Sequence, residues 1–206
     1  MSHPTRKSHP ADRLYAIVLA AGASTRFGSP KQLVRIGGRP LLHTVVTRAA
    51  EVTGNALIVV LGCGASELAP LLKHSPGSVV VNRHWREGLA SSIRTGVLRL
   101  PPTCTGVLLL LADQAAVTTD DLKRLAGTWG RRPQLIAAAL YAGAAGVPAI
   151  FPRSTFSELT RLRGDTGART ILRRSADRVV RVPMPGAELD LDTPEDLLAL
   201  EPSKPA

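Results

Sequence analysis

The stretch LYAIVLAAGASTRFGSPKQ, residues 14–32, joins an apolar run to a loop of small residues and cations. The unbroken apolar run from Leu14 to Ala21 predicts a buried β-strand. Two glycines follow, and because glycine has no Cβ, backbone N–H groups in such a loop can come close to an anion. Arg26 and Lys31 add positive charge to the same loop. The stretch therefore predicts a strand that ends in a phosphate-binding loop.

This loop matches neither of the two commonest phosphate-binding patterns. The dinucleotide pattern GxGxxG needs three closely spaced glycines, and the P-loop pattern GxxxxGK[ST] needs a lysine directly after its second glycine. Here Gly28 is followed by Ser29 and Pro30. A plain dinucleotide-binding oxidoreductase and a P-loop nucleotide hydrolase are therefore both disfavoured. An ordinary Gly-rich turn with solvated cations would explain any two of these residues, but not the whole string.

Short apolar runs rich in β-branched residues alternate with stretches of helical spacing along the rest of the chain. The predicted strands are Leu14–Ala21, Ala56–Leu61, Ser78–Val81, Gly106–Ala112, Gln134–Tyr141, Val147–Phe151 and Arg178–Val182. This alternation is typical of α/β folds with a mostly parallel sheet. Because Val107–Leu111 is continuously hydrophobic, that strand is expected to be buried on both faces. We therefore expect a single α/β domain with a Rossmann-like, doubly wound, mostly parallel sheet.

Three helix starts are marked by capping signals. Pro40 fits the first position of a helix over Leu41–Glu51. Thr118 or Thr119 can cap a helix over Asp120–Trp129, whose early carboxylates favour the positive end of the helix dipole. The string Thr193-Pro194-Glu195-Asp196 precedes a short helix over Leu197–Leu200 in the same way.

Length and composition limit the class of protein. The chain has 206 residues, of which 44% are hydrophobic, so it can bury one sizeable core. We expect a domain over residues 14–201, between a flexible leader over 1–13 and a tail over 202–206. No apolar run approaches the roughly 20 residues of a membrane-spanning helix, and the polar leader does not resemble a signal peptide, so we expect a cytoplasmic protein with no membrane partner. Cys63 and Cys104 lack the spacing of a disulfide framework or a zinc site.

The formal net charge of +10 suits an anionic ligand. Residues 153–181 contain eight arginines and three acidic residues, which also raises the alternative of a nucleic-acid-binding module. However, the chain has only three Phe, two Trp and two Tyr, and none of them interleaves with the basic run to form a stacking surface. We therefore expect no nucleic-acid partner and treat most of these arginines as a solvated basic face.

Several strings together resemble the nucleotidyltransferases of the molybdenum cofactor type. The loop string runs Leu-Ala-Ala-Gly-x-Ser-x-Arg-x-Gly-x-Pro-Lys-Gln from Leu19 to Gln32. The strings that follow it in the family's order are Asn82–Ser92, Ala112-Asp113-Gln114, Gly146–Phe151, Gly164–Arg169 and Asp190–Asp196. Within that family the chain is most similar to the CTP:molybdopterin cytidylyltransferases. Ala20-Ala21-Gly22, where guanylyl-transferring relatives have Ala-Gly-Gly, favours CTP over GTP.

The resemblance implies a transfer of CMP. A phosphate oxygen of molybdopterin attacks the α-phosphorus of CTP, and pyrophosphate leaves. This reaction needs positioning and charge neutralisation more than deprotonation, because the nucleophile is already an anion. Two alternatives stay open: transfer to another phosphorylated acceptor, such as a sugar or polyol phosphate, and a non-catalytic carrier that delivers molybdopterin. A client molybdoenzyme is a further possible partner.

The resemblance also assigns roles to individual residues. The catalytic residues are Arg26 and Lys31, which would hold the β- and γ-phosphates, and Asp113. The nucleotide-binding residues are Leu19, Ala20, Ala21, Gly22, Lys31, Asn82, Gly88 and Ser91. Asp165 and Arg169 would contact the acceptor. Asp113 and Asp192 would hold Mg²⁺, which Mn²⁺ can replace.

Several of these roles have simpler alternatives. Asp113 follows the most hydrophobic strand, where the carboxyl ends of parallel strands meet ligands, but a lone Asp after a strand more often forms a turn. Asp192 lies in a string that also reads as a capped helix start, and Asp190 could replace it as a ligand. The chain has Ala115 where the family usually has proline, which would loosen the turn after Asp113. It has Val147 where many relatives have a polar side chain, so any contact made by that side chain is absent.

Overall fold

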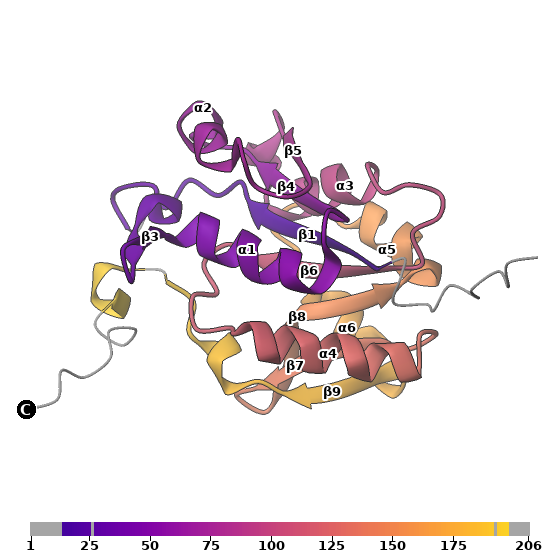
Figure 1. The fold of residues 1–206 in the computed structure, drawn as a ribbon. Helices are drawn as coiled ribbons and strands as arrows, with labels where there is room; N and C mark the ends of the chain where they lie inside the picture. The colour runs from indigo at the N-terminus through magenta and orange to yellow at the C-terminus, as the bar shows by residue number, and fades with distance from the viewer. Residues whose placement is uncertain (1–13, 26, 192, 198–206) are drawn as a thin grey trace, which may run out of the picture.

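The computed structural model describes residues 14–25, 27–191 and 193–197. Its centre is a seven-stranded sheet with the order β5-β4-β1-β6-β8-β7-β9 (Figure 1). The strands are β1 (Leu14–Ala20), β4 (Leu57–Leu61), β5 (Ser78–Val81), β6 (Gly106–Leu111), β7 (Ile136–Tyr141), β8 (Ala144–Pro152) and β9 (Val179–Pro183). β8 runs antiparallel to its two neighbours, β6 and β7, whereas the other pairings in the sheet are parallel. The expected mostly parallel α/β sheet is therefore confirmed.

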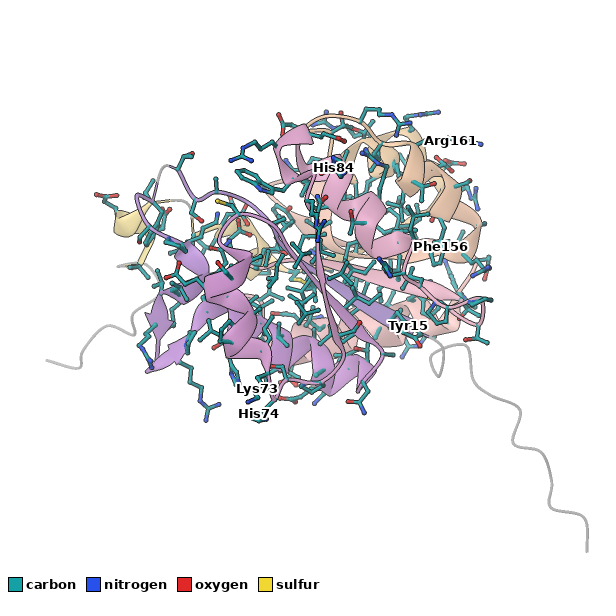
Figure 2. All side chains as sticks on the ribbon, turned by 90° about the horizontal axis from the view of Figure 1, so that it is seen from above. Tyr15, Lys73, His74, His84, Phe156 and Arg161 are labelled. Atoms are coloured by element: carbon teal, nitrogen blue, oxygen red, sulfur yellow. The ribbon has the colours of Figure 1, made fainter. Side chains whose placement is uncertain are left out.

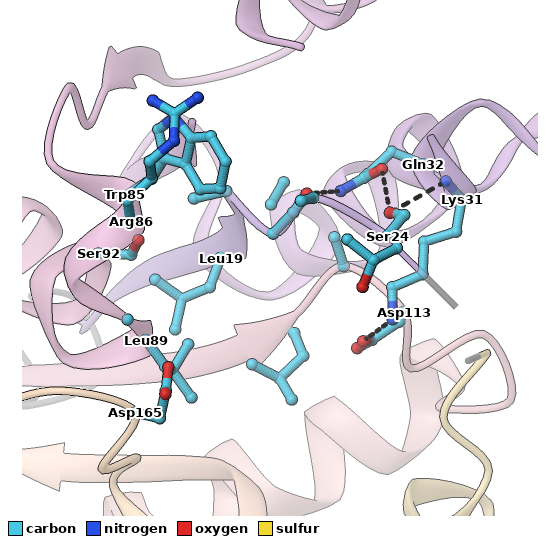
Figure 3. A pocket seen from close by; sticks show the side chains of 18 residues that line it. Leu19, Ser24, Lys31, Gln32, Trp85, Arg86, Leu89, Ser92, Asp113 and Asp165 are labelled. Atoms are coloured by element: carbon cyan, nitrogen blue, oxygen red, sulfur yellow. Dashed lines mark hydrogen bonds and ion pairs between the residues drawn. The ribbon is translucent and has the colours of Figure 1, made fainter. Parts of the chain in front are cut away.

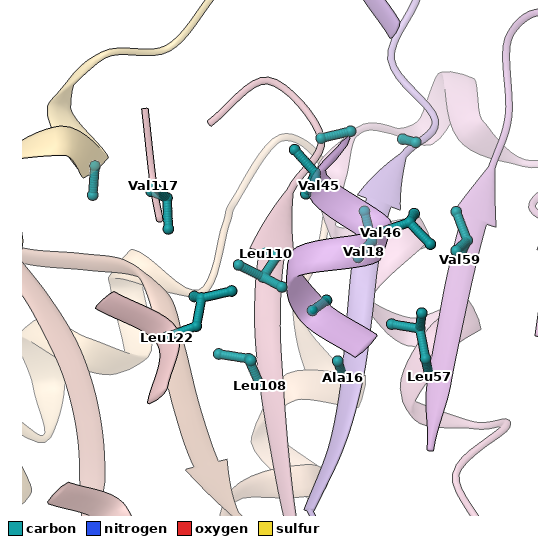
Figure 4. Close-up of a cluster of buried hydrophobic side chains, with 14 of the residues drawn as sticks. Ala16, Val18, Val45, Val46, Leu57, Val59, Leu108, Leu110, Val117 and Leu122 are labelled. Atoms are coloured by element: carbon teal, nitrogen blue, oxygen red, sulfur yellow. The ribbon is translucent and has the colours of Figure 1, made fainter. Parts of the chain in front are cut away.

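Helices cover both faces of the sheet because the side chains of each strand alternate between them. Ala16, Val18 and Ala20 of β1 pack in one apolar cluster, and Ile17 and Leu19 pack in another. The first cluster contains α1 (Leu41–Thr53), α2 (Ala65–Leu68) and α4 (Thr119–Arg131) (Figure 4). The second contains α3 (Leu89–Val97), α5 (Phe156–Arg161) and α6 (Arg169–Arg174). In the view from above, Phe156 and Arg161 of α5 lie across the sheet from Lys73 and His74 (Figure 2).

Short elements complete the chain between these layers. A two-stranded ribbon pairs β2 (Arg35–Ile36) with β3 (Arg39–Pro40) around Gly37 and Gly38, which both have positive φ. Single 3₁₀ turns span Lys31–Leu33, Ala69–Leu72, Trp85–Glu87, Arg153–Thr155, Ala176–Arg178, Pro185–Glu188 and Pro194–Leu197. None of the helices within the described ranges is long and apolar enough to cross a membrane.

Most predicted boundaries lie within one or two residues of the observed ones, and three further differences have a specific structural reason. β8 begins at Ala144, three residues before the predicted start, because a hairpin turn through Ala142 and Gly143 joins it directly to β7. Pro40 ends β3 and stands at the N-cap of α1 instead of its first helical position. The predicted helix over Leu197–Leu200 is observed as the 3₁₀ turn Pro194–Leu197, and residues 198–200 lie outside the described part. The predicted leader and tail, residues 1–13 and 202–206, lie outside it too.

Both cysteines are free thiols. Cys104 is fully buried just before β6, and burial raises the pKa of its thiol to about 11. Because the thiolate is the reactive form of cysteine, Cys104 is a packing residue and not a nucleophile.

Thr118, and not Thr119, caps α4. Its hydroxyl oxygen accepts a hydrogen bond from the Asp121 N–H at 3.1 Å, and Asp121 Oδ2 accepts one from the Thr118 N–H at 3.0 Å. Burial acts to raise the pKa of Asp121, but hydrogen bonds from Thr118 and from the Arg124 guanidinium outweigh it and hold that pKa below its ordinary value. This capping box satisfies amides that the first turn of a helix leaves without intrahelical partners.

Thr118→Ala is expected to lower the free energy of unfolding by about 1 kcal/mol at neutral pH, because the cap is lost. A carboxylate with a depressed pKa stabilises the fold above its unfolded-state pKa and loses that contribution as the pH falls through its folded-state pKa. The difference from the wild type should therefore shrink in acid. Urea unfolding at several pH values measures both effects. Thr119→Ala is the control, with an expected change below about 0.5 kcal/mol; equal losses in the two variants would contradict the assignment of the cap.

Candidate active site

A cavity of about 440 Å³ lies at the carboxyl ends of β1 and β6 (Figure 3). One wall is the end of β1 and the loop after it, from Leu19 to Thr25, together with Lys31 and Gln32. The opposite wall is formed by Trp85, Arg86, Gly88 and Leu89, with Ser92 and Asp165, and Leu111–Asp113 form the floor. The predicted nucleotide-binding residues Leu19, Ala20, Ala21, Gly22, Lys31 and Gly88 all line this cavity.

Lys31 and Asp113 meet in this cavity. The Lys31 ammonium donates to Asp113 Oδ2 at 2.6 Å, and the two side chains are only 14% and 18% exposed. Their position follows from the sheet, because β1 and β6 are parallel neighbours and their carboxyl ends open onto the same edge. The other carboxylate oxygen, Asp113 Oδ1, is buried and has no hydrogen-bond partner among the described residues. Since buried carboxylate oxygens are normally satisfied, this oxygen is suited to a ligand or a cation.

The turn after Asp113 is held by contacts from distant parts of the chain. Arg48 of α1 donates from Nη1 to the carbonyls of Ala115 and Val117, at 2.7 and 2.8 Å. Burial lowers the pKa of the Arg48 guanidinium from its ordinary value. The Leu191 N–H donates to the Asp113 carbonyl at 3.1 Å. The absence of proline at Ala115 is therefore offset by hydrogen bonds that fix the turn.

Ser24 organises the loop after β1. It has a positive φ of 53°, and its hydroxyl accepts the Lys31 N–H at 3.3 Å and donates to Gln32 Oε1 at 3.2 Å. Gln32 is buried, and its Nε2 donates to the Gly22 carbonyl at 3.4 Å. These contacts tie the two ends of the loop together. Arg26, which was predicted to be the second cation of this loop, lies outside the described residues.

Asn82 supports the opposite wall from behind. It is only 3% exposed, and its Nδ2 donates to the hydroxyls of Ser91 and Ser92, at 2.7 and 3.0 Å. Its Oδ1 accepts the His84 N–H at 2.9 Å. Ser92 and Gly88 line the cavity, whereas Asn82 and Ser91 do not. Asn82 therefore fixes the segment that bears the lining residues.

Gly88 allows the turn at Gly164 and Asp165 to pack against this wall. It has a φ of +95°, and a Cβ at this position would lie 2.5 Å from Gly164 atoms and from Asp165 Oδ1. The Ala90 N–H donates to the Gly164 carbonyl at 3.0 Å, so one N-terminal amide of α3 is already used. As a result Asp165, one of the two predicted acceptor contacts, lines the 440 Å³ cavity.

A second cavity, of about 250 Å³, adjoins the first and shares Leu19, Leu89 and Leu111 with it. We call it the β6–β8 cavity, because Leu111 and Val147 of these strands lie on its wall. Its walls are mainly apolar, and its polar members are Tyr141, Arg169 and Asp190. Arg169 donates to the Tyr141 hydroxyl at 3.0 Å, and its guanidinium lies 5.8 Å from the centre of the Tyr141 ring. Arg169, the other predicted acceptor contact, thus lies in the neighbouring cavity.

The described residues contain no cluster of three or more His, Cys, Asp or Glu side chains that could hold a metal by itself. Asp192, the predicted second ligand, lies outside the described residues. Its neighbour Leu191 donates a backbone hydrogen bond to the Asp113 carbonyl. A divalent cation that keeps substrate phosphates as ligands needs only one or two carboxylates. Asp113, with an oxygen that lacks a partner, fits that requirement.

Sequence reasoning gave no role to several residues of the site. Ser24, Gln32 and Trp85 stand in the strings that carry the family resemblance, so their place in those strings was an available signal. Trp85 lines the cavity, and Arg86 stacks on its ring at 4.4 Å. Arg48 carried no such signal, because its partners are 67 and 69 residues away along the chain.

The chain is similar over most of its length to two curated proteins of similar size. Purine catabolism protein PucB of Bacillus subtilis is 28% identical, over 89% of this chain and 93% of PucB. Nicotine blue oxidoreductase of Paenarthrobacter nicotinovorans is 28% identical, over 77% of this chain and 80% of that protein. Bifunctional protein GlmU of Sorangium cellulosum is 30% identical over 57% of this chain, and the match spans only 26% of the length of GlmU.

Solved structures share the fold. Rv0371c of Mycobacterium tuberculosis has a TM-score of 0.78 and 33% identity, over 91% of this chain and 96% of that one. A structure of Rv0371c in complex with manganese has a TM-score of 0.73 and 30% identity, over 91% and 97% of the two chains. A model of the MobA-like NTP transferase domain matches residues 16–179, which is most of this chain. The chain, with its nucleotidyltransferase fold, therefore belongs to the MobA-like NTP transferase domain family.

Proposed function

We propose that the protein transfers CMP from CTP to the phosphate of a molybdopterin-type cofactor, with release of pyrophosphate. The observation that carries this proposal is the pairing of Lys31 with Asp113 inside the 440 Å³ cavity. It places a cation and a carboxylate with one unpartnered oxygen beside a loop whose backbone can approach a triphosphate. Nucleotidyl transfer needs this combination of positioning and charge neutralisation.

Lys31 and Arg26 are the proposed binders of the β- and γ-phosphates. Lys31 neutralises Asp113 in the ligand-free protein, and its ammonium can turn to a phosphate oxygen when the triphosphate enters. The loop from Leu19 to Gly22, with Gly88 across the cavity, would hold the nucleotide, and Asn82 and Ser91 would act by holding that wall in place. The Ala20-Ala21-Gly22 sequence supports CTP as the donor nucleotide.

Asp113 is the proposed metal ligand, with Asp192 or Asp190 as a second carboxylate and substrate phosphates completing the coordination. Magnesium suits such oxygen ligands, and manganese is the alternative; the related Rv0371c was solved with manganese. When bound, the ion neutralises charge on the triphosphate and on the leaving pyrophosphate. Asp113 supplies the carboxylate for this site, and Lys31 and Arg26 supply the remaining positive charge.

The β6–β8 cavity is the proposed acceptor site. Its apolar side chains offer surfaces against which the faces of a pterin ring can pack, and its few polar members can meet hydrogen-bonding groups at the edge of the ring. Arg169 and Asp165 are the proposed contacts to the acceptor's phosphate-bearing end. Sugar and polyol phosphates remain the second candidate acceptors, and the 30% identity to bifunctional protein GlmU over 57% of this chain keeps an acceptor other than molybdopterin open.

An acceptor panel tests this assignment. Purified protein is incubated with CTP and Mg²⁺ and with one of three acceptors: molybdopterin cofactor, a hexosamine 1-phosphate or a polyol phosphate. Pyrophosphate release is expected only in the reaction that contains the cofactor as acceptor. Release only in a reaction that contains the sugar phosphate or the polyol phosphate would identify that compound as the acceptor instead. Tight binding of the cofactor without any pyrophosphate release would instead favour the carrier alternative.

A further inference from the structure

β6 and β8 separate at the point where the β6–β8 cavity begins. Their antiparallel pairing runs from Gly106↔Pro152 to Leu109↔Ala149 and then stops. In the same register, Leu111 would pair with Val147. The Arg153 N–H donates to the Thr105 carbonyl at 2.9 Å, and hydrogen-bonded pairs recur at every second residue of an antiparallel ladder. Leu111 and Val147 therefore occupy the place of a hydrogen-bonded pair that is not formed.

The carboxamide of Gln114 occupies that place. Its Oε1 accepts the Leu111 N–H at 3.3 Å, and its Nε2 donates to the Val147 carbonyl at 2.8 Å. Gln114 is only 1% exposed. These two contacts take the donor and the acceptor that Leu111 and Val147 would otherwise offer each other. The side chain thus continues the hydrogen-bond ladder while keeping the two backbones apart.

The pairing of β8 with its other neighbour, β7, is also irregular at this position. The pairing of β7 with β8 shifts between Ala138↔Ala149 and Ala139↔Gly146, which leaves Val147 and Pro148 as extra residues in β8. A β-bulge of this kind bends the strand that carries it, and bulges recur next to active sites. The irregularity lies where β8 leaves β6, so β8 has slack at the position where the Gln114 carboxamide stands between the two strands.

We propose that Gln114 is a spacer that holds β6 and β8 apart and thereby keeps the β6–β8 cavity open for the acceptor. Leu111 and Val147, the two residues that it separates, both line that cavity. Gln114 is a positioning residue and sets the space available to the acceptor's ring system. The term acceptor rests on the proposed function, whereas the spacing of the strands does not.

Gln32 provides a matched control on the other side of the site. It is also a buried glutamine, 3% exposed, and its carboxamide joins the Ser24 hydroxyl to the Gly22 carbonyl. Gln32 thus fixes the loop after β1 through its carboxamide, in the way that Gln114 fixes the ends of β6 and β8 next to the cavity. Replacing each by methionine keeps the length of the side chain and removes its hydrogen bonds.

The test is a crossed comparison of Gln114→Met and Gln32→Met in steady-state kinetics. For Gln114→Met we expect the KM for the acceptor to rise about tenfold or more and the KM for CTP to change less than about threefold. For Gln32→Met we expect the KM for CTP to rise about tenfold or more and the KM for the acceptor to change less than about threefold. Gln114→Asn keeps the amide but is one methylene shorter, and it is expected to behave as Gln114→Met does. An unchanged acceptor KM in both Gln114 variants, or equal rises in both KM values, would overturn the proposal.

A crystal structure of Gln114→Met tests the spacer without any substrate. With the carboxamide gone, Leu111 and Val147 are expected to pair directly, with their Cα atoms about 5.5 Å apart as in a hydrogen-bonded antiparallel pair. Strands that remain separated around an open cavity would overturn the spacer. If the wild type is inactive with molybdopterin but the strands close in the variant, the proposed function fails and the spacer stands.

Discussion

Asp113→Asn is expected to lower kcat about 10³-fold or more while the protein stays folded. The substitution keeps the size of the side chain but removes the negative charge and one of the oxygens that would hold the metal. The unfolding free energy should fall, because the Lys31 ammonium, only 14% exposed, loses the negative charge of Asp113, so activity is compared at a temperature where the variant is fully folded. The measurement is pyrophosphate release at saturating substrates over a range of Mg²⁺ concentrations.

Asp121→Asn is the matched control for this variant. Asp121 also pairs with a cation at 2.6 Å, through Arg124, but it lies at the start of α4 and does not line either cavity of the site. This control is expected to lose stability and to keep its turnover. Full Mg²⁺-dependent turnover in Asp113→Asn would show that the metal assignment is wrong.

Lys31→Met is expected to lower kcat/KM for CTP by about 10²-fold or more, the usual cost of removing one group that stabilises charge in a transition state. Methionine keeps the apolar stem of the side chain but cannot contact a phosphate. The variant should also be less stable, because it leaves the Asp113 carboxylate, only 18% exposed, without its ammonium partner. Initial rates at varied CTP, together with thermal unfolding, separate the two effects.

Lys123→Met is the control for Lys31→Met. Lys123 pairs with Glu51 at 3.5 Å, and both side chains are about half exposed, so its loss should change neither turnover nor stability appreciably. Added CTP should raise the unfolding temperature of the wild type and of Lys123→Met more than that of Lys31→Met. Equal stabilisation of all three proteins by CTP would contradict a phosphate contact at Lys31.

The sheet could be predicted from the sequence because its strands are short, apolar and rich in β-branched residues. β6 shows this most clearly, since it is buried on both faces and reads as an uninterrupted hydrophobic run. β2 and β3 were missed because each has two residues, too few for any periodic pattern. The start of β8 was missed because Ala144, Ala145 and Gly146 have little β-propensity, and the hairpin with β7 determines their conformation instead.

The site was predictable residue by residue but not as an arrangement. Lys31 and Asp113 were each identified, one by its loop and the other by its place after a buried strand, yet their contact joins positions 82 residues apart. Arg48 carries no local sign of its role, because its partners lie 67 and 69 residues away along the chain. Gln114 stands in one of the strings that carry the resemblance, but its contact with Val147 joins positions 33 residues apart. Asn82 is a different case: the resemblance implies that it binds the nucleotide, and its buried side chain donates hydrogen bonds to Ser91 and Ser92.

Transfer of CMP can be followed directly with CTP labelled at the α-phosphorus, purified protein, Mg²⁺ and molybdopterin cofactor, with ATP, GTP and UTP labelled in the same way in parallel. Label is expected to pass from CTP to the cofactor, with one pyrophosphate released for each label transferred, and Asp113→Asn is expected to do neither. The proposed reaction would be contradicted if none of the four nucleotides gave transfer to active cofactor, or if Asp113→Asn transferred label as fast as the wild type.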